Sequence, residues 1–244
     1  MSRAWSGAWG VLVLLSILIA APAFAPLAGA AFWAHAGLLA LAGLMAWGAL
    51  TRIALSAGAD EAGRRGLGAG GLQFGRAEIR IVAALLANLV FVAVVASVML
   101  LAVVMLGVAT GLDLGSIQAA PVRATDGRLW IVAGAAAAAL LMLGLVLMRL
   151  SLFAPASVGR GRIVAMNSMG VAHGAFWPLL LLWGVIAATA AVIPAAMAQG
   201  WIAPSAARLI AAVVLPWLWA PLAVGATAAA YRQLEYWTPG EGAR

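Results

Sequence analysis

Between Arg149 and Pro178 the chain reads RLSLFAPASVGRGRIVAMNSMGVAHGAFWP, a basic, glycine-containing stretch between two long apolar blocks. The whole chain is 66% hydrophobic and 9% charged, and all 14 of its basic residues are arginine. Three of these arginines, Arg149, Arg160 and Arg162, fall in this one stretch, which we call the central loop. Such a concentration of positive charge places the central loop in water on the basic side of a membrane.

The apolar blocks around the central loop are long enough to cross a membrane. The chain has 244 residues and a mean hydropathy of +1.10, and its apolar runs repeatedly exceed the ~18 to 20 residues that cross ~30 Å of hydrocarbon. Because a backbone in hydrocarbon must satisfy its own hydrogen bonds, such runs form helices. We therefore predict an all-α polytopic membrane protein with one domain, residues 1–244. Its six transmembrane helices are predicted over residues 9–28, 32–55, 79–107, 129–150, 176–198 and 209–231.

The distribution of arginine predicts how these helices are oriented. If they form three helical hairpins, one side receives eleven arginines: Arg3, Arg52, Arg64, Arg65, Arg76, Arg80, Arg149, Arg160, Arg162, Arg232 and Arg244. The other side receives three: Arg123, Arg128 and Arg208. Basic loops remain in the cytoplasm, so both termini are predicted to be cytoplasmic. The use of arginine without lysine, and the abundance of alanine and glycine, favour a high-GC bacterial gene and hence a bacterial inner membrane.

The first apolar block has two interpretations. Its basic start, apolar centre and Ala23-Phe24-Ala25 resemble a secretory signal peptide with a small-residue cleavage site. Trp5 and Trp9 at its start are instead typical of an interfacial belt, and Pro26 would adjoin the cleaved bond. We expect an uncleaved first helix. Cleavage would leave five helices in the same orientation.

Several kinds of chemistry find no support in the sequence. The chain has no cysteine, which excludes disulfides and thiolate metal sites. Its two histidines, His35 and His173, are predicted at opposite ends of the helices, so no metal site or cofactor is expected. The glycine-rich residues 63–75 lack the Gly-Lys-Ser/Thr ending of a phosphate-binding loop, and we interpret them as a flexible, solvated linker. The net charge of +7 is spread thinly and indicates topology, not nucleic-acid binding.

The arginines on the predicted cytoplasmic side form a rim with interleaved aromatic residues. Within this rim we select six candidate residues for binding a lipid or a partner: Arg52, Arg149, Arg160, Arg162, His173 and Trp177. One interpretation is that the arginines only set the topology. The other is that they bind anionic lipid headgroups, with residues 161–174 lying along the membrane as a short amphipathic segment. Membrane lipids are therefore the expected partners, and an unknown protein or a second copy of the chain is also compatible.

No catalytic constellation is found, so we expect a non-enzymatic protein with a structural, regulatory or accessory role in envelope or lipid homeostasis. The alternative is a small permease or a lipid-translocating protein. A polar path through the third, fifth and sixth helices would favour transport, but their one strongly polar interior residue is Asn88. An interhelical hydrogen bond is its expected role. A cytoplasmic cluster of Glu78, His173 and arginine around a cavity would instead favour an enzyme.

The central loop also resembles a known family. Its Arg149-Leu150-Ser151-Leu152, Pro155 and Arg162-Ile163, followed by Ser168, Gly174, Phe176 and Trp177, are similar to the membrane domain attached to bacterial glycerophosphoryl diester phosphodiesterases and to its free-standing YciC-like relatives. Met169, Ala172 and His173 stand where that family usually has tryptophan, threonine and a basic residue. The resemblance implies a membrane domain. It implies no hydrolase activity, because no phosphodiesterase domain is attached.

Overall fold

In a computed structural model of the protein, residues 2–25, 27–111, 127–172 and 174–235 are described, and all of their regular secondary structure is helical. Six helical segments among these residues are long and apolar enough to cross a membrane. The elements are α1 (Ser2–Phe24), α2 (Gly29–Leu55), α3 (Ala59–Arg64), η1 (Ala69–Gly71), α4 (Arg76–Ala109), α5 (Gly127–Leu150), α6 (Phe153–Gly159), α7 (Ser168–Val171), α8 (Phe176–Ala198), α9 (Pro204–Val214), η3 (Leu215–Trp219) and α10 (Ala220–Glu235).

The six predicted helices all have counterparts in the structure. The bounds agree for α8, while α1 lies earlier in the chain than its predicted range and α2, α4 and α5 begin two or three residues before theirs. The predicted sixth helix is divided into α9, the π-helical segment η3 and α10. Pro216 and Pro221 lie at this division, as expected from the backbone donor that each proline lacks.

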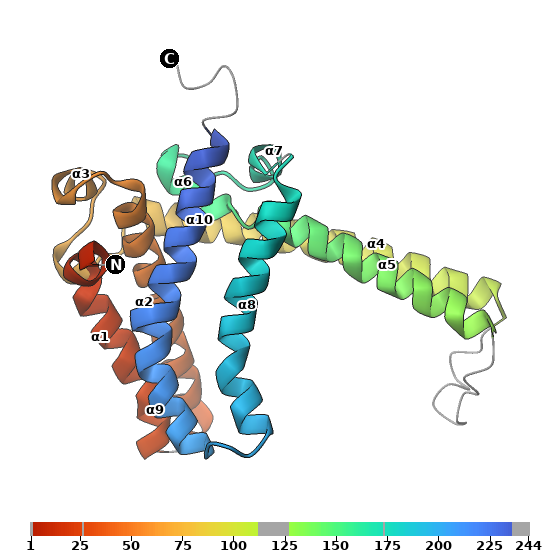
Figure 1. The fold of residues 1–244 in the computed structure, drawn as a ribbon, viewed down its shortest axis with the longest axis horizontal. Coiled ribbons are helices and arrows are strands. Elements are labelled where there is room, and N and C mark those ends of the chain that lie inside the picture. The colour runs from red at the N-terminus through yellow and green to blue at the C-terminus, as the bar shows by residue number, and fades with distance from the viewer. Residues whose placement is uncertain (1, 26, 112–126, 173, 236–244) are drawn as a thin grey trace.

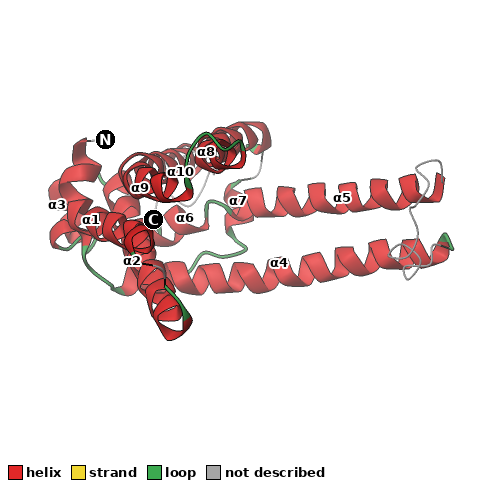
Figure 2. Cartoon of the chain, turned by 90° about the horizontal axis from the view of Figure 1, so that it is seen from below, coloured by secondary structure: helices red, strands yellow, loops and turns green. Residues whose placement is uncertain are grey.

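The helices form a bundle with a long projecting pair. α1, α2, α8 and the α9–α10 segment stand side by side, whereas α4 and α5 leave the bundle together at a wide angle (Figure 1). The view from below shows the same pair extending away from the other helices (Figure 2). No part of the most apolar window of either α4 or α5 is buried within the protein. Among the described residues, most of the buried positions of this pair therefore lie at the start of α4 and the end of α5.

Two clusters of buried residues hold the bundle together. One lies between α1 and α2 and includes Leu12, Ala46 and Leu50. The other surrounds the short helix α6, where Ile81 of α4 and Tyr231 of α10 are almost completely buried. Alanine is frequent in both clusters. Small side chains let helix backbones approach closely, which is how helices gain contact energy in lipid.

The first helix is an integral part of this packing. Ala8, Val11 and Leu12 are fully buried against α2, and α1 also packs along α9. Trp5 Nε1 donates a hydrogen bond of 3.0 Å to the carbonyl of Trp217, the residue that Pro221 leaves without its usual helical donor. Removal of residues 1–25 would expose one wall of the α1–α2 core. Pro26, on which the cleavage argument depends, lies outside the described residues.

The charge count predicted that the central loop lies in water, but part of the loop is buried in the protein. Residues 153–158 form most of α6 and are all buried, in contact with α2, α4 and α10. The Ser157 hydroxyl accepts a hydrogen bond from the Val164 N–H at 3.0 Å and donates to the Val164 carbonyl at 3.2 Å. This reciprocal pair folds the loop back on itself. Only four of residues 161–174 form a helix, α7, so the predicted amphipathic segment is much shorter than expected.

The prediction of a flexible, solvated linker over residues 63–75 is wrong for the part that docks on the bundle, although residues 63–66 are exposed. Part of this stretch forms η1, which packs on α1 and α2. Gly71 is buried and has a φ of +76°, a backbone conformation that favours glycine. A Cβ at Gly71 would lie 3.0 Å from the Val11 side chain and 3.1 Å from that of Ala49. The glycines therefore permit close docking of the loop onto the bundle.

Candidate anion-binding site

The site begins with an ion pair buried between two helices. Arg52 lies in the last turn of α2 and Glu78 in the first turn of α4, and Arg52 Nη2 donates to Glu78 Oε2 at 2.7 Å. Their side chains are 3% and 0% exposed. Burial of two charges is tolerated only when they are paired and hydrogen-bonded. This pair therefore fixes the start of α4 against the end of α2.

The local sequence accounts for the position of Glu78. α4 begins after Gly75, and the carboxylate of Glu78 reaches back to accept a 2.9 Å hydrogen bond from the Gly75 N–H. This bond satisfies one of the donors that every helix start leaves free. On the other side of the carboxylate lies Gly48 of α2, where a Cβ would overlap Glu78 Oε1. Glycine at position 48 is therefore what makes room for the buried carboxylate.

Arg52 retains hydrogen-bonding capacity beyond this ion pair. Its Nε and Nη1 atoms are buried and have no partner among the described residues. A guanidinium carries five N–H donors in a fixed plane, and a buried donor without a partner is costly. These atoms are therefore suited to a further acceptor.

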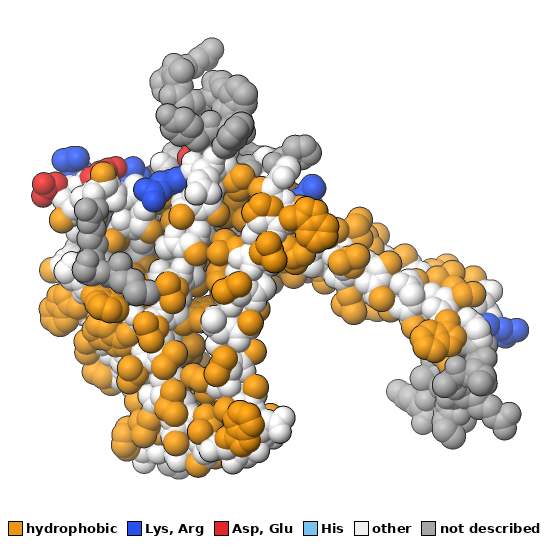
Figure 3. All heavy atoms as spheres, in the orientation of Figure 1, with side chains coloured by type: hydrophobic (Ala, Val, Ile, Leu, Met, Phe, Trp, Pro, Cys, Tyr) orange, Lys and Arg blue, Asp and Glu red, His pale blue; other side chains and the backbone are white. Residues whose placement is uncertain are grey.

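Next to Arg52 lies a cavity of about 410 Å³ that we call the arginine cavity. Its lining includes five arginines and no acidic residue: Arg52, Arg64, Arg65, Gly66, Gly75, Arg76, Ala77, Arg80 and Val158. They come from the end of α2, from α3 and the turn after it, from the start of α4 and from α6. Charged side chains gather at this end of the bundle, while apolar side chains cover much of the face seen below it (Figure 3).

Two of these arginines are already paired and three are not. Arg52 is paired with Glu78, and Arg65 forms an exposed pair with Glu61 at 2.8 Å. The pKa of Glu61 is lowered, first by a hydrogen bond from the Ala57 N–H and next by Arg65. Within the described part of the chain, no ion pair is formed by the other three: Arg64, Arg76 and Arg80. The cavity therefore carries an excess of positive charge.

The six residues selected from the sequence are distributed over several places. Arg52 lines the arginine cavity, whereas Arg149 and Trp177 line a different cavity of about 590 Å³ between α5, α7 and α8. Arg160 forms an ion pair of 3.1 Å with Glu235. Arg162 is exposed, and His173 lies outside the described residues. The predicted set therefore does not form one surface.

Sequence reasoning placed all five of the cavity's arginines on the predicted cytoplasmic rim but selected only Arg52 as a candidate site residue. It also did not identify Glu78 as a buried partner of Arg52. One local signal was available: Glu78 stands three residues after Gly75, a position that favours a helix start. The contact between residues 52 and 78 joins two separate helices, and no local pattern reports it.

Comparisons of the chain with protein-family models, with curated proteins and with solved structures give no match. The resemblance of the central loop to the phosphodiesterase-associated membrane domain therefore remains a prediction. Function has to be argued from the cavity itself.

Proposed function

We propose that the protein is a non-enzymatic, multi-pass protein of a bacterial inner membrane that binds an anionic lipid headgroup in the arginine cavity. Its role would be structural, regulatory or accessory, in envelope or lipid homeostasis. The observation that supports this proposal is a cavity lined by five arginines and no carboxylate. A lipid phosphate supplies the negative charge that the cavity lacks.

The chemistry of arginine favours a phosphate ligand. The planar guanidinium matches the oxygens of a phosphate with two parallel hydrogen bonds, and such charge-assisted bonds are stronger than neutral ones. Arg52 has two buried donors, Nε and Nη1, without a partner among the described residues, and they lie on different edges of its guanidinium. Three arginines without an ion pair among the described residues, Arg64, Arg76 and Arg80, surround the same space.

The position of the cavity favours a lipid as the source of this phosphate. Arg52 and Glu78 stand where α2 ends and α4 begins, next to apolar segments long enough to cross a membrane. Helix ends of this kind lie at the level of the headgroups. Each arginine near an anionic leaflet gains about 1 kcal/mol.

The proposed orientation places the arginine cavity in the cytoplasm, with three hairpins and both termini on that side. Its basis is the unequal division of arginine, eleven on one side and three on the other. We expect reporter domains fused after Gly66 and Arg160 to be cytoplasmic and a reporter fused after Gln199 to be periplasmic. The measurement is the activity of a compartment-specific enzyme. A periplasmic signal at Arg160 would contradict this orientation.

The polar path that would favour transport is not found among the described residues, and the cluster that would favour an enzyme includes His173, which lies outside them. The space between α2, α8 and α10 is lined by tryptophan, alanine and other largely apolar residues, not by a polar path. Asn88 is buried, but neither its amide oxygen nor its nitrogen has a partner among the described residues, so the expected interhelical hydrogen bond is not formed there. Glu78 is engaged by Arg52 and Gly75.

The test of the proposed function is a double variant, Arg64→Gln/Arg80→Gln. Each lost charge is worth about 1 kcal/mol at an anionic surface, and about 1.4 kcal/mol is a factor of ten in affinity. We therefore expect the apparent Kd for phosphatidylglycerol to rise roughly thirtyfold. The protein is placed in nanodiscs of neutral lipid, and bound phosphatidylglycerol is measured by titration and native mass spectrometry.

The matched control is Arg162→Gln/Arg232→Gln, which removes the same charge from two exposed arginines that do not line the cavity. It should retain phosphatidylglycerol nearly as the unchanged protein does. Equal losses in both double variants would show that general charge, not the cavity, attracts the lipid. Binding of inorganic phosphate as tight as that of the lipid would identify a soluble anion as the ligand.

A further inference from the structure

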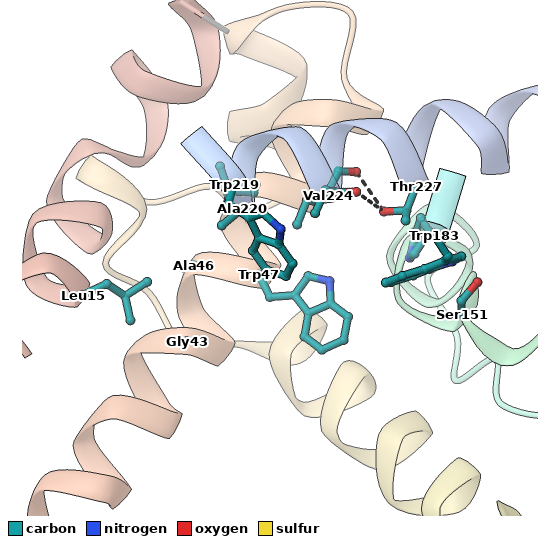
Figure 4. Close-up of a pocket in the computed structure, with 13 residues that line it drawn as sticks. Leu15, Gly43, Ala46, Trp47, Ser151, Trp183, Trp219, Ala220, Val224 and Thr227 are labelled. Carbon is teal, nitrogen blue, oxygen red and sulfur yellow. Dashed lines mark hydrogen bonds between the residues drawn. The ribbon is translucent and has the colours of Figure 1, made fainter. Parts of the chain in front are cut away.

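A second cavity lies inside the bundle, and unlike the arginine cavity it is lined mainly by apolar residues. Its volume is about 310 Å³, and its walls come from α1, α2, α6, α8, η3 and α10, with Ser151 after α5. Three tryptophans line it, Trp47, Trp183 and Trp219, together with the small residues Gly43 and Ala46 (Figure 4). We call this space the tryptophan cavity.

The π-helical segment η3 helps to build this cavity. Trp217 and Trp219 both lie in η3 but turn to different neighbours. Trp217 Nε1 donates to Ser16 Oγ of α1 at 2.9 Å, while Trp219 Nε1 donates to the Ile186 carbonyl of α8 at 3.1 Å. One extra residue in the turn changes the direction of the following side chains, a feature that is frequent at functional sites. Trp219 thereby becomes part of the cavity wall.

All groups lining the tryptophan cavity are uncharged, and most are apolar. The hydroxyl of Ser151 already donates to the carbonyl of Met148 in α5 at 2.6 Å, and that of Thr227 to the carbonyl of Ala223 in α10 at 2.9 Å. One donor of this lining is fully buried without a partner among the described residues: the indole N–H of Trp183. The cavity therefore offers a neutral, largely apolar interior with a buried indole donor.

These properties restrict the ligand. A charged group would find no counter-charge, and its burial would be very costly. Water is poorly held by apolar walls, and an empty space of this size forfeits the dispersion contacts of its lining. The volume corresponds to roughly ten water molecules at ~30 Å³ each, which suits one chain or one small ring system and not a whole phospholipid.

The depth of Trp183 gives a further restriction. It lies seven residues after Phe176, the first residue of α8, which is about 10 Å along the helix. If Phe176 lies at the level of the headgroups, as in the proposed orientation, this donor is two turns further inside than the ester groups of bulk phospholipids. The atom that accepts the Trp183 N–H must therefore belong to a ligand that can enter the hydrocarbon region.

We propose that the tryptophan cavity binds a neutral, single-chain lipid that carries a carbonyl oxygen, as in a fatty acyl ester, and that this oxygen accepts the Trp183 N–H. The chain fills the space between the indole rings and the small residues of α2 and α10. This inference does not rest on anion binding, because the two cavities share no lining residue.

Filling the cavity from Gly43 tests the proposal. A Cβ at Gly43 would meet nothing within 4 Å, so the side chain of Gly43→Leu extends into the cavity without a clash. The probe is the methyl ester of a fatty acid carrying a photoreactive diazirine. We expect photolabelling of the lining segments to fall at least tenfold. The labelled peptides are identified by mass spectrometry of the full-length protein in nanodiscs.

The control is Gly184→Leu, a glycine on α8 that is exposed and likewise has nothing within 4 Å. It makes the same chemical change on the outside of the bundle and should leave labelling unchanged. Labelling of the lining segments at the unchanged level in Gly43→Leu would overturn the proposal. So would labelling confined to the projecting α4–α5 pair.

A second variant, Trp183→Phe, tests the hydrogen bond without filling the space. It keeps an aromatic wall and removes the donor. Loss of one neutral hydrogen bond corresponds to roughly a threefold to tenfold weaker apparent affinity. This weakening should appear for the methyl ester and not for a photoreactive alkane of the same length. An equal effect on both probes would show that Trp183 is only a packing residue and that the carbonyl is not recognised.

Discussion

Replacing Glu78 with glutamine should lower the free energy of unfolding by about 3–5 kcal/mol, the cost of leaving a buried charge without its partner. Glutamine keeps the shape of the side chain, so the change isolates the charge. Arg52 would remain 2% exposed with no carboxylate beside it. The measurement is a denaturant titration in mixed micelles, followed by far-UV circular dichroism.

The control for Glu78→Gln is Glu61→Gln, which breaks an ion pair of similar length whose side chains are 30–33% exposed. Exposed ion pairs contribute little to stability because water and salt screen them, so this variant should be close to the unchanged protein. The two glutamine variants therefore differ in burial and not in chemistry. A loss for Glu78→Gln no larger than that for Glu61→Gln would contradict the buried ion pair.

The double variant Arg52→Met/Glu78→Leu separates stability from binding. Apolar residues of similar volume often replace a buried ion pair without loss of stability. The double variant should therefore recover most of the stability that Glu78→Gln loses. Its binding of phosphatidylglycerol should nevertheless remain weaker than that of the unchanged protein, because Arg52 and its donors are gone from the arginine cavity. Recovery of both properties would show that Arg52 has no role in binding.

The six long apolar helices were predictable because hydrocarbon leaves the backbone few choices. Continuous apolar runs such as residues 176–198 must satisfy their hydrogen bonds internally, and their ends are marked by polar residues, glycine and proline. The direction in which α4 and α5 leave the bundle was not predictable. That direction depends on how α6 packs between α2 and α4, and hydropathy gives no information on contacts between helices.

The central loop shows why composition alone misplaced a segment. Its arginines suggested a solvated connection, yet residues 153–158 contain no charge and form the buried helix α6. The charges lie before and after this segment, so a count over the whole loop concealed it. A shorter window would have separated FAPASV from the residues around it.

The candidate site was predictable in its charge but not in its construction. The sequence placed Arg64, Arg76 and Arg80 on one side of the membrane, and the structure adds that they surround one cavity with Arg52. Their convergence depends on the return of α4 past the end of α2, which the buried ion pair fixes. Local sequence patterns could not predict the contact between Gly48 and Glu78 either, because a glycine in a helix can occur for several different reasons.

Replacing Gly71 with valine should separate the docked glycine loop from α1 and lower the free energy of unfolding by roughly 2–6 kcal/mol. About 1–3 kcal/mol comes from forcing a side chain into a left-handed backbone conformation, and about 1–3 kcal/mol comes from overpacking against Val11 and Ala49. The same denaturant titration measures the loss. Hydrogen exchange at residues 69–75 should rise with it, since undocking exposes these backbone amides.

The matched control is Gly66→Val. Gly66 has a similar φ of +82°, but a Cβ there would meet nothing within 4 Å. It therefore shares the backbone strain of Gly71→Val and lacks the collision, so its loss should be smaller by the packing contribution. Equal losses in the two variants would mean that conformation alone explains the effect and that the loop is not docked. Because α4 begins directly after this loop, a docked loop also predicts weaker phosphatidylglycerol binding in Gly71→Val, as Arg76 and Arg80 lose their fixed position.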